Sequence, residues 1–180
     1  MNIAILASGE GTNAQNIIEH LRSKNYNFII YTNNPSANVI KRAKNCGVNY
    51  FIIDNKDLLS SLRLQKIDFI VLAGYLRLIP SNVIDVYKKR IINIHPSLLP
   101  KYGGKGMWGT NVHKLVIENK EAESGITIHY VSERYDEGEI IEQHRCEVLF
   151  CDTVEILQKK ISLLEREYYP KCVERILFTL

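Results

Sequence analysis

An amide and an imidazole lie two residues apart in the middle of this 180-residue chain, at Asn93 and His95. The apolar pair Ile91-Ile92 precedes them, and Pro96 follows. Residues i and i+2 of an extended strand point to the same face, so both side chains would act on one point where the strand ends. A hydrogen-bond donor beside a proton carrier is what is needed to stabilise an oxyanion and to move a proton.

A carboxylate that could orient this imidazole is Asp136, in the segment Tyr135-Asp136-Glu137-Gly138 between two expected strands. Asp-x-Gly segments are usually simple turns. If Asp136 reaches His95, we expect it to orient the ring and raise its pKa, so that the ring stays cationic near neutral pH. The sequence alone leaves open whether the two side chains meet.

A glycine-containing turn, Ser8-Gly9-Glu10-Gly11-Thr12-Asn13, follows the first expected strand and opens a helix. Glycine lets backbone N–H groups approach an anion, and a helix N-terminus favours negative charge. Thr12 and Asn13 add side-chain donors, so the turn predicts a phosphate site, with a plain tight turn as the alternative. The chain lacks the Lys-Ser/Thr of a P-loop, the third glycine of a dinucleotide fingerprint and an acidic residue after the second strand, which disfavours NAD.

Two further segments are candidate binding elements. Residues 73–79 follow the fourth expected strand, where ligands of parallel sheets bind, and could hold a flat heterocycle or simply pack in the core. Glu165 lies in the middle of a long helix, and a solvated helix face is the simpler explanation for it.

A glycine-rich segment, Gly103–Gly109, follows Pro100 and is expected to be a mobile or tightly turned loop. Trp108 within it is either a lid residue or a packed anchor. His129 is expected to be structural, and the sequence identifies no partners for the remaining histidines, His20, His113 and His144.

Strand-like and helix-like segments alternate through the first hundred residues, which predicts a doubly wound, mostly parallel α/β sheet. We expect strands at 3–7, 28–32, 50–53, 69–73 and 91–94, and helices at 13–23, 37–46, 56–64 and 111–118. Period-2 alternation predicts antiparallel strands at 125–131 and 139–148. A long amphipathic helix is expected over 152–169, capped by Asp152 or Thr153 and ended or kinked by Pro170.

Length and composition are those of one globular domain. The net charge of +3 is too small and too dispersed to indicate nucleic acid. The four cysteines have no metal-binding spacing, so we expect them to be reduced and mostly buried. The chain shows neither a signal peptide nor an apolar run of about 20 residues, which predicts a cytoplasmic protein without a membrane partner.

Four segments together resemble the folate-dependent formyltransferases, over essentially the whole chain. They are residues 3–13 (IAILASGEGTN), 72–77 (LAGYLR), 93–102 (NIHPSLLPKY) and 135–138 (YDEG). The Asn-x-His-Pro-Ser-Leu-Leu-Pro string is specific to this superfamily, and the opening Ser-Gly-x-Gly-Thr-Asn resembles the branch that acts on glycinamide ribonucleotide. The resemblance implies one Rossmann-like domain over 1–180, with a phosphate-binding half (1–100) and a folate-binding and C-terminal half (101–180).

The resemblance also implies an activity: transfer of the formyl group of 10-formyltetrahydrofolate, as cosubstrate, to the amine of glycinamide ribonucleotide in purine synthesis. No metal is expected, since Asn93 and His95 would supply the electrophilic help. Asn93, His95 and Asp136 match the catalytic trio. Positions matching the ribonucleotide site are Gly11, Thr12, Asn13 and Glu165. Positions matching the folate site are Leu76, Arg77, Leu78, Ile79, Asn93, Ser132, Glu133, Arg134, Tyr135 and Asp136.

Other interpretations stay open at this point. A sugar-amine formyltransferase on the same scaffold would share the trio, and a non-catalytic nucleotide- or folate-binding module would need only the pocket. Methionyl-tRNA formyltransferase and formyltetrahydrofolate deformylase are less well matched, because each carries an additional domain and the tail here has no basic surplus for tRNA. Small molecules are the expected partners, and the sequence leaves monomer and homodimer open.

The chain departs from the commoner family pattern in two places. The glycine-rich segment Gly103–Gly109 is about five residues longer than the usual loop and lacks its histidines. The segment around Asn55-Lys56 is compressed, and Lys56 is a candidate replacement for a basic folate contact that the family often has there.

Overall fold

The computed structural model describes residues 1–180 and contains one seven-stranded sheet in the order β3-β2-β1-β4-β5-β6-β7. Strands β1 to β5 are parallel, and β6 and β7 run antiparallel to their neighbours, which confirms the predicted fold class. The strands are β1 Asn2–Leu6, β2 Asn27–Thr32, β3 Asn49–Ile52, β4 Phe69–Leu72, β5 Ile91–His95, β6 Glu123–Tyr130 and β7 Ile140–Glu147.

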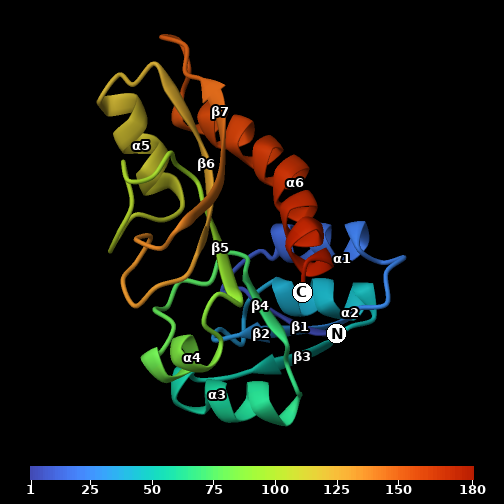
Figure 1. The fold of residues 1–180 in the computed structure, drawn as a ribbon. Coiled ribbons are helices and arrows are strands. Elements are labelled where there is room, and N and C mark those ends of the chain that lie inside the picture. Colours follow the sequence, from blue (N-terminus) through green and yellow to red (C-terminus); the bar gives the residue numbers. More distant parts are fainter.

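Helices cover both faces of the sheet (Figure 1). They are α1 Thr12–His20, α2 Val39–Cys46, α3 Asn55–Leu64, α4 Ser81–Val86, α5 Thr110–Glu118 and α6 Val154–Phe178. Helices α3 and α4 lie on one face, and α1 and α6 lie side by side on the other (Figure 1).

Strand β1 shows why both faces are covered. Its side chains alternate between the two hydrophobic cores: Ile3 and Ile5 belong to the core under α1, α2 and α6, whereas Ala4 and Leu6 belong to the core under α3 and α4. All four are fully buried. The sequence of a strand that is buried on both faces is a continuous apolar run, because neither face meets solvent.

Helix α6 extends beyond its expected end at residue 169, so of the two effects expected of Pro170, ending the helix is wrong. Pro170 does not end this helix, which continues to Phe178 with Pro170 inside it. Proline lacks the N–H that would bond the carbonyl four residues earlier, that of Arg166. Asn16 on α1 donates its Nδ2 to the Arg166 carbonyl oxygen at 2.7 Å, so the neighbouring helix replaces the missing partner. The predicted cap at Thr153 is present, with its hydroxyl accepting from the backbone N–H of Ile156 at 3.3 Å.

The sequence missed α4, a six-residue helix after Pro80 of which only Val83 is buried. A helix of this length presents too little of an apolar face to show a 3.6-residue period. The other predicted elements are present, with boundaries that differ by at most a few residues.

The expectation that the cysteines are mostly buried is wrong. All four are free, but only Cys172 is buried: Cys46 and Cys146 are half-buried and Cys151 is exposed. Cys146 lies on the edge strand β7, and Cys151 lies in the loop after it, where few groups cover them. No helix combines the length and the apolar character that crossing a membrane requires.

Candidate active site

A cavity of about 600 Å³ opens at the carboxyl ends of β1, β4 and β5. After β1 the chain continues to β2, toward one edge of the sheet, and after β4 it continues to β5, toward the other edge. The loops that follow these two adjacent strands therefore diverge. Ligands of open α/β sheets bind at such a switch point. The cavity is lined by the turn after β1, the loop after β4, the end of β5, the glycine-rich loop, the loop after β6 and one side of α6.

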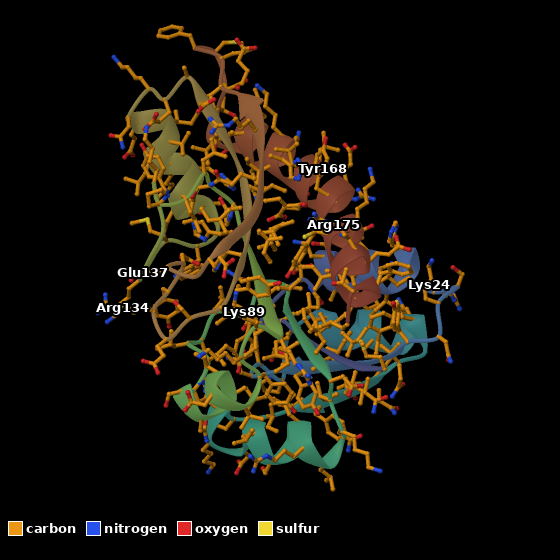
Figure 2. All side chains as sticks on the ribbon, viewed as in Figure 1. Lys24, Lys89, Arg134, Glu137, Tyr168 and Arg175 are labelled. Carbon is orange, nitrogen blue, oxygen red and sulfur yellow. The ribbon has the colours of Figure 1, made fainter.

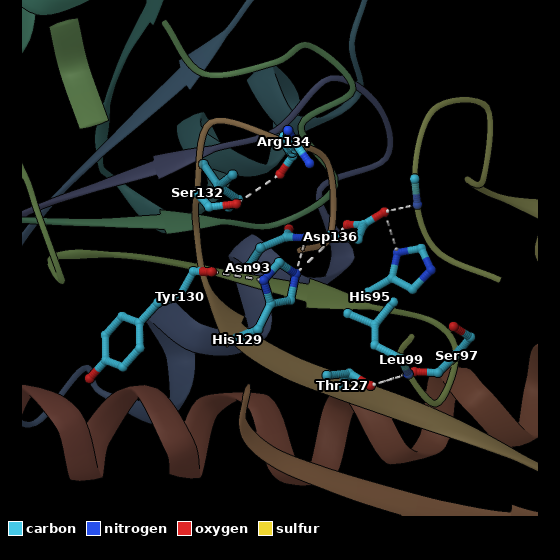
Figure 3. A network of polar contacts seen from close by, with 12 residues as sticks. Asn93, His95, Ser97, Leu99, Thr127, His129, Tyr130, Ser132, Arg134 and Asp136 are labelled. Atoms are coloured by element: carbon cyan, nitrogen blue, oxygen red, sulfur yellow. Dashed lines mark hydrogen bonds and ion pairs between the residues drawn. The ribbon is translucent and has the colours of Figure 1, made fainter. Parts of the chain in front are cut away.

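His95 and Asp136 meet in this cavity (Figure 3). His95 Nδ1 lies 3.4 Å from Asp136 Oδ2, and His95 Nε2 lies 2.8 Å from the carbonyl oxygen of Tyr102. Both ring nitrogens therefore face oxygen acceptors, which suits the ring when it carries two protons. The Nδ1 contact is longer than a strong charge-assisted hydrogen bond, so an oxygen of a ligand can share that proton.

The pKa of His95 is lowered, which corrects the expected direction. Burial is the largest cause, because it disfavours the charged ring; the Asp136 carboxylate and the Tyr102 carbonyl raise the pKa but do not offset it. The ring is only 4% exposed. In the free protein the imidazole is therefore mostly neutral at neutral pH. Negative charge developing nearby would favour its protonated form.

The Asp136 carboxylate is held from several sides. The backbone N–H of Gly104 donates to Asp136 Oδ2 at 2.9 Å, and His129 Nε2 lies 3.7 Å from Oδ1. Burial raises the pKa of Asp136, but His129, His95 and the Gly104 N–H together bring it below its usual value. Asp136 is therefore ionised at neutral pH.

Asn93 is oriented by His129, a residue that sequence reasoning had taken as structural. The two are direct neighbours across β5 and β6, and Asn93 Nδ2 lies 3.1 Å from His129 Nε2 (Figure 3). His129 Nδ1 lies 2.9 Å from the carbonyl of Tyr130, which can only accept, so Nδ1 carries a proton. His129 Nε2 lies between the Asn93 amide and Asp136 Oδ1, so it contacts both groups and orients the Asn93 side chain. Only the register of the two strands could have revealed this role.

The turn after β1 has the geometry of an anion site. Gly11 has φ 71°, and a Cβ on it would lie 2.4 Å from Val39 Cγ2, so a glycine is required there. No side chain caps α1, which leaves the N–H groups of its first turn available. Thr12 and Asn13 line the same part of the cavity.

Glu165 is half-buried and faces this turn. Asn13 Nδ2 donates to Glu165 Oε2 at 3.1 Å, which joins α1 to α6 beside the cavity. Burial raises the pKa of Glu165, and the Asn13 hydrogen bond opposes that rise. A carboxylate placed next to an anion site is suited to accept from hydroxyl groups of a ligand.

Most of the residues expected at a folate site line the cavity, with one exception. Those that do are Leu76, Arg77, Leu78, Ile79, Asn93, Ser132, Arg134, Tyr135 and Asp136. Glu133 is exposed and does not line it. Arg134 and Glu137 project from the loop after β6 (Figure 2) and are paired at 3.4 Å. Lys56 is exposed on the first turn of α3 and does not line the cavity either.

The glycine-rich loop forms another part of the wall. Trp108 lines the cavity and is 54% exposed, so the interpretation as a packed anchor is wrong. His113, one turn into α5, also lines the cavity; it is buried, and its Nδ1 has no hydrogen-bond partner. The sequence offered no sign of this placement, since it depends on how α5 folds back toward β5.

An amide donor and an imidazole at the end of β5 meet an ionised carboxylate from the loop after β6, next to an anion-binding turn. This arrangement defines an enzyme that handles a developing oxyanion. The class is an α/β group-transfer enzyme. Comparison with known proteins agrees: the chain matches the description "Formyl transferase" over residues 1–173. The chain belongs to the formyl transferase family.

Curated relatives carry a more specific name. The chain is 36% identical to a chloroplastic phosphoribosylglycinamide formyltransferase of Arabidopsis thaliana, over 97% of this chain and 66% of that protein. It is 34% identical to phosphoribosylglycinamide formyltransferase of Bacillus subtilis (strain 168), over 97% of this chain and 93% of that one. A second plant relative, from Vigna unguiculata, is matched over 60% of its length.

A solved structure gives the same result. The crystal structure of phosphoribosylglycinamide formyltransferase from Bacillus halodurans aligns with a TM-score of 0.89 and 34% identity, covering 98% of this chain and 95% of that one. The relatives and this structure therefore agree on both the family and the fold.

Proposed function

We propose that this protein transfers the formyl group of 10-formyltetrahydrofolate to the amine of glycinamide ribonucleotide. The products are formylglycinamide ribonucleotide and tetrahydrofolate. The observation that carries the proposal is the meeting of Asn93, His95 and Asp136 in one cavity beside the turn at Gly11–Asn13. The names of the relatives support it.

The two substrates take opposite parts of the cavity. The phosphate of the ribonucleotide binds the N–H groups at Gly11–Asn13, and its ribose hydroxyls bind Glu165. The folate ring system binds between residues 76–79 and the loop 132–136. In this arrangement the reacting groups lie where the phosphate-binding half of the domain, residues 1–100, meets the other half, residues 101–180.

The chemistry proceeds through a tetrahedral intermediate. The amine nitrogen attacks the formyl carbon, and the carbonyl electron pair moves onto oxygen. Asn93 and protonated His95 donate hydrogen bonds to that oxygen, and Asp136 stabilises the charge on the ring. When the C=O bond re-forms, the carbon–N10 bond breaks and its electron pair goes to the folate nitrogen. That nitrogen takes up a proton from His95. The amine gives its own proton to solvent water, from which the imidazole is protonated again, so one proton is lost and one is gained.

The test is a formyl-transfer assay on wild type and on His95→Ala, with His144→Ala as a matched control, since His144 does not line the cavity. Removing one oxyanion-stabilising donor typically lowers kcat by about 10²- to 10³-fold. We expect at least that loss for His95→Ala and none for His144→Ala. Wild-type turnover of a nucleotide-linked amino sugar, but not of glycinamide ribonucleotide, would favour the sugar-amine alternative. A His95→Ala variant at full rate would contradict the mechanism.

A further inference from the structure

The glycine-rich loop carries an exposed aromatic side chain and an exposed cation, and both line the cavity. The residues are Lys105 and Trp108, three positions apart. Neither has a place in the steps described above. Their combination on one loop suggests a ligand with a flat ring joined to a negative charge.

Lys105 differs from the other lysine and arginine side chains of the cavity wall. These are Arg77, Lys105 and Arg134. Arg77 lies 3.4 Å from an Asp54 oxygen, and Arg134 lies 3.4 Å from a Glu137 oxygen. Lys105 has no carboxylate within ion-pair distance, so it is the one such cation on the wall that is free to bind an anion.

Trp108 belongs to an apolar rim, which we define as Leu76, Leu78, Trp108 and Tyr135. These side chains are 48%, 40%, 54% and 37% exposed and come from three different loops. Large apolar groups that gather around a cavity and remain open to solvent mark a surface for an apolar ligand. A ribonucleotide is polar over most of its surface, whereas a folate carries two aromatic ring systems.

The loop is attached on the folate side of the cavity. The N–H of Gly104 bonds Asp136, the last residue of the segment 132–136. Gly104, Gly106 and Gly109 have positive φ, a conformation that side-chain-bearing residues rarely adopt, so the loop can present Lys105 and Trp108 without strain. The ribonucleotide phosphate already has its donors at Gly11–Asn13, which leaves the carboxylates of folate as the anion for Lys105.

We propose that the glycine-rich loop binds the aminobenzoyl-glutamate part of the folate cosubstrate, with Trp108 packing on the benzoyl ring and Lys105 pairing with a glutamate carboxylate. The inference rests on the proposed function, because it assigns the occupant of that same site. It also accounts for a cationic contact that Lys56, outside the cavity, does not supply.

Trp108 is the only tryptophan in the chain, so intrinsic fluorescence reports on this loop directly. The experiment titrates the wild-type protein with tetrahydrofolate, with tetrahydropteroate (the same ring system without glutamate) and with glycinamide ribonucleotide alone. We expect a saturable change with both pteridine compounds, tighter binding of the one that carries glutamate, and no change with the ribonucleotide. A change caused by the ribonucleotide alone would overturn the assignment.

Variants separate the two contacts. Trp108→Ala should weaken binding of both pteridine compounds about five- to tenfold by calorimetry, and Trp108→Phe should restore most of it. Lys105→Gln should weaken tetrahydrofolate about two- to fivefold and leave tetrahydropteroate unchanged. Lys114→Gln is the matched control, since Lys114 is exposed on α5 and outside the cavity.

The steady-state assay distinguishes this inference from the proposed function. Trp108→Ala and Lys105→Gln should raise KM for formyltetrahydrofolate while KM for the ribonucleotide stays constant. Equal folate affinity in wild type and both variants would overturn the inference and leave the formyl-transfer proposal intact. Absence of wild-type turnover would overturn the proposed function, whereas the binding titration would still decide the role of the loop.

Discussion

At the scale of the residue, the site depends on groups that restrain one another. His95 is bracketed by Asp136 and the Tyr102 carbonyl, and Asn93 is held by His129. Burial keeps the free imidazole mostly neutral, and Asp136 opposes that effect. In the proposed mechanism this balance is what allows the ring to take up a proton when an oxyanion forms and to release it to a leaving nitrogen.

The prediction at this scale concerns pH. Asp136→Asn removes the negative charge that raises the pKa of His95, so this pKa should fall further. Because the protonated ring is the proton donor, the limb of log kcat on which His95 loses its proton should move to lower pH, and the rate at neutral pH should fall. A pH–rate profile measures the shift, with Glu137→Gln, an exposed neighbour, as control. An unchanged profile would remove Asp136 from the mechanism.

At the scale of the element, helices α1 and α6 are positioned by contacts with neighbouring elements. The turn before α1 brings Gly11 against Val39, and the Gly9 carbonyl accepts from the Val39 N–H at 3.1 Å. Helix α6 passes through Pro170 because α1 supplies Asn16. Each helix that lines the cavity on this side thus depends on a neighbour for its exact position.

Gly11→Ala should displace the anion-binding turn. The added Cβ would lie within 2.8 Å of three Val39 atoms at a positive φ, so we expect a loss of about 1–3 kcal/mol in the free energy of unfolding. Affinity for the ribonucleotide should fall more than affinity for folate. Calorimetry on Gly47→Ala provides the comparison, since Gly47 has the same positive φ, nothing lies within 4 Å of a Cβ there, and it does not line the cavity. A larger loss for folate would mean that the two pockets are assigned the wrong way round.

Asn16 and Pro170 should be energetically coupled. Asn16→Ala removes the donor to the Arg166 carbonyl and should cost about 0.5–1.5 kcal/mol in the free energy of unfolding. In a Pro170→Ala background the helix can bond that carbonyl itself, so the same change should cost less. A double-mutant cycle by urea unfolding measures the difference. Equal costs in both backgrounds would show that Asn16 does not replace the missing helical bond.

At the scale of the whole molecule, α6 connects the sheet, α1 and the cavity. Tyr169 is fully buried, and its hydroxyl donates to the Leu72 carbonyl at the end of β4, at 2.7 Å. Leu72 and Glu165, one turn before Tyr169 on α6, both line the cavity. This buried hydrogen bond therefore links α6 directly to the strand end beside the site, in addition to the packing of the helix on the core.

Tyr169→Phe should lower the free energy of unfolding by about 1–3 kcal/mol, because the Leu72 carbonyl loses a buried donor. The same variant should raise KM for the ribonucleotide, since α6 carries Glu165. Tyr168→Phe is the control in urea unfolding: Tyr168 is half-buried and its hydroxyl has no comparable partner. If both variants unfold at the same urea concentration as wild type, the Tyr169 bond does not hold α6 in place.

The sequence by itself determined the features that depend on neighbours in the chain. The two-residue period of a strand explains why the β1 side chains alternate between two cores and why Asn93 and His95 share one face. Backbone sterics explain the glycine in the turn before α1. Those rules act over a few residues, so they can be recognised without knowing the fold.

Only the tertiary structure decided the contacts between distant segments. Asp136 reaches His95, His129 orients Asn93 and Asn16 offsets Pro170 because of strand register and helix packing. The net pKa of His95 was decided there as well, since burial depends on every element around the ring. The desolvation of a buried group and the pairing of strands depend on residues throughout the molecule, so no local sequence pattern predicts them.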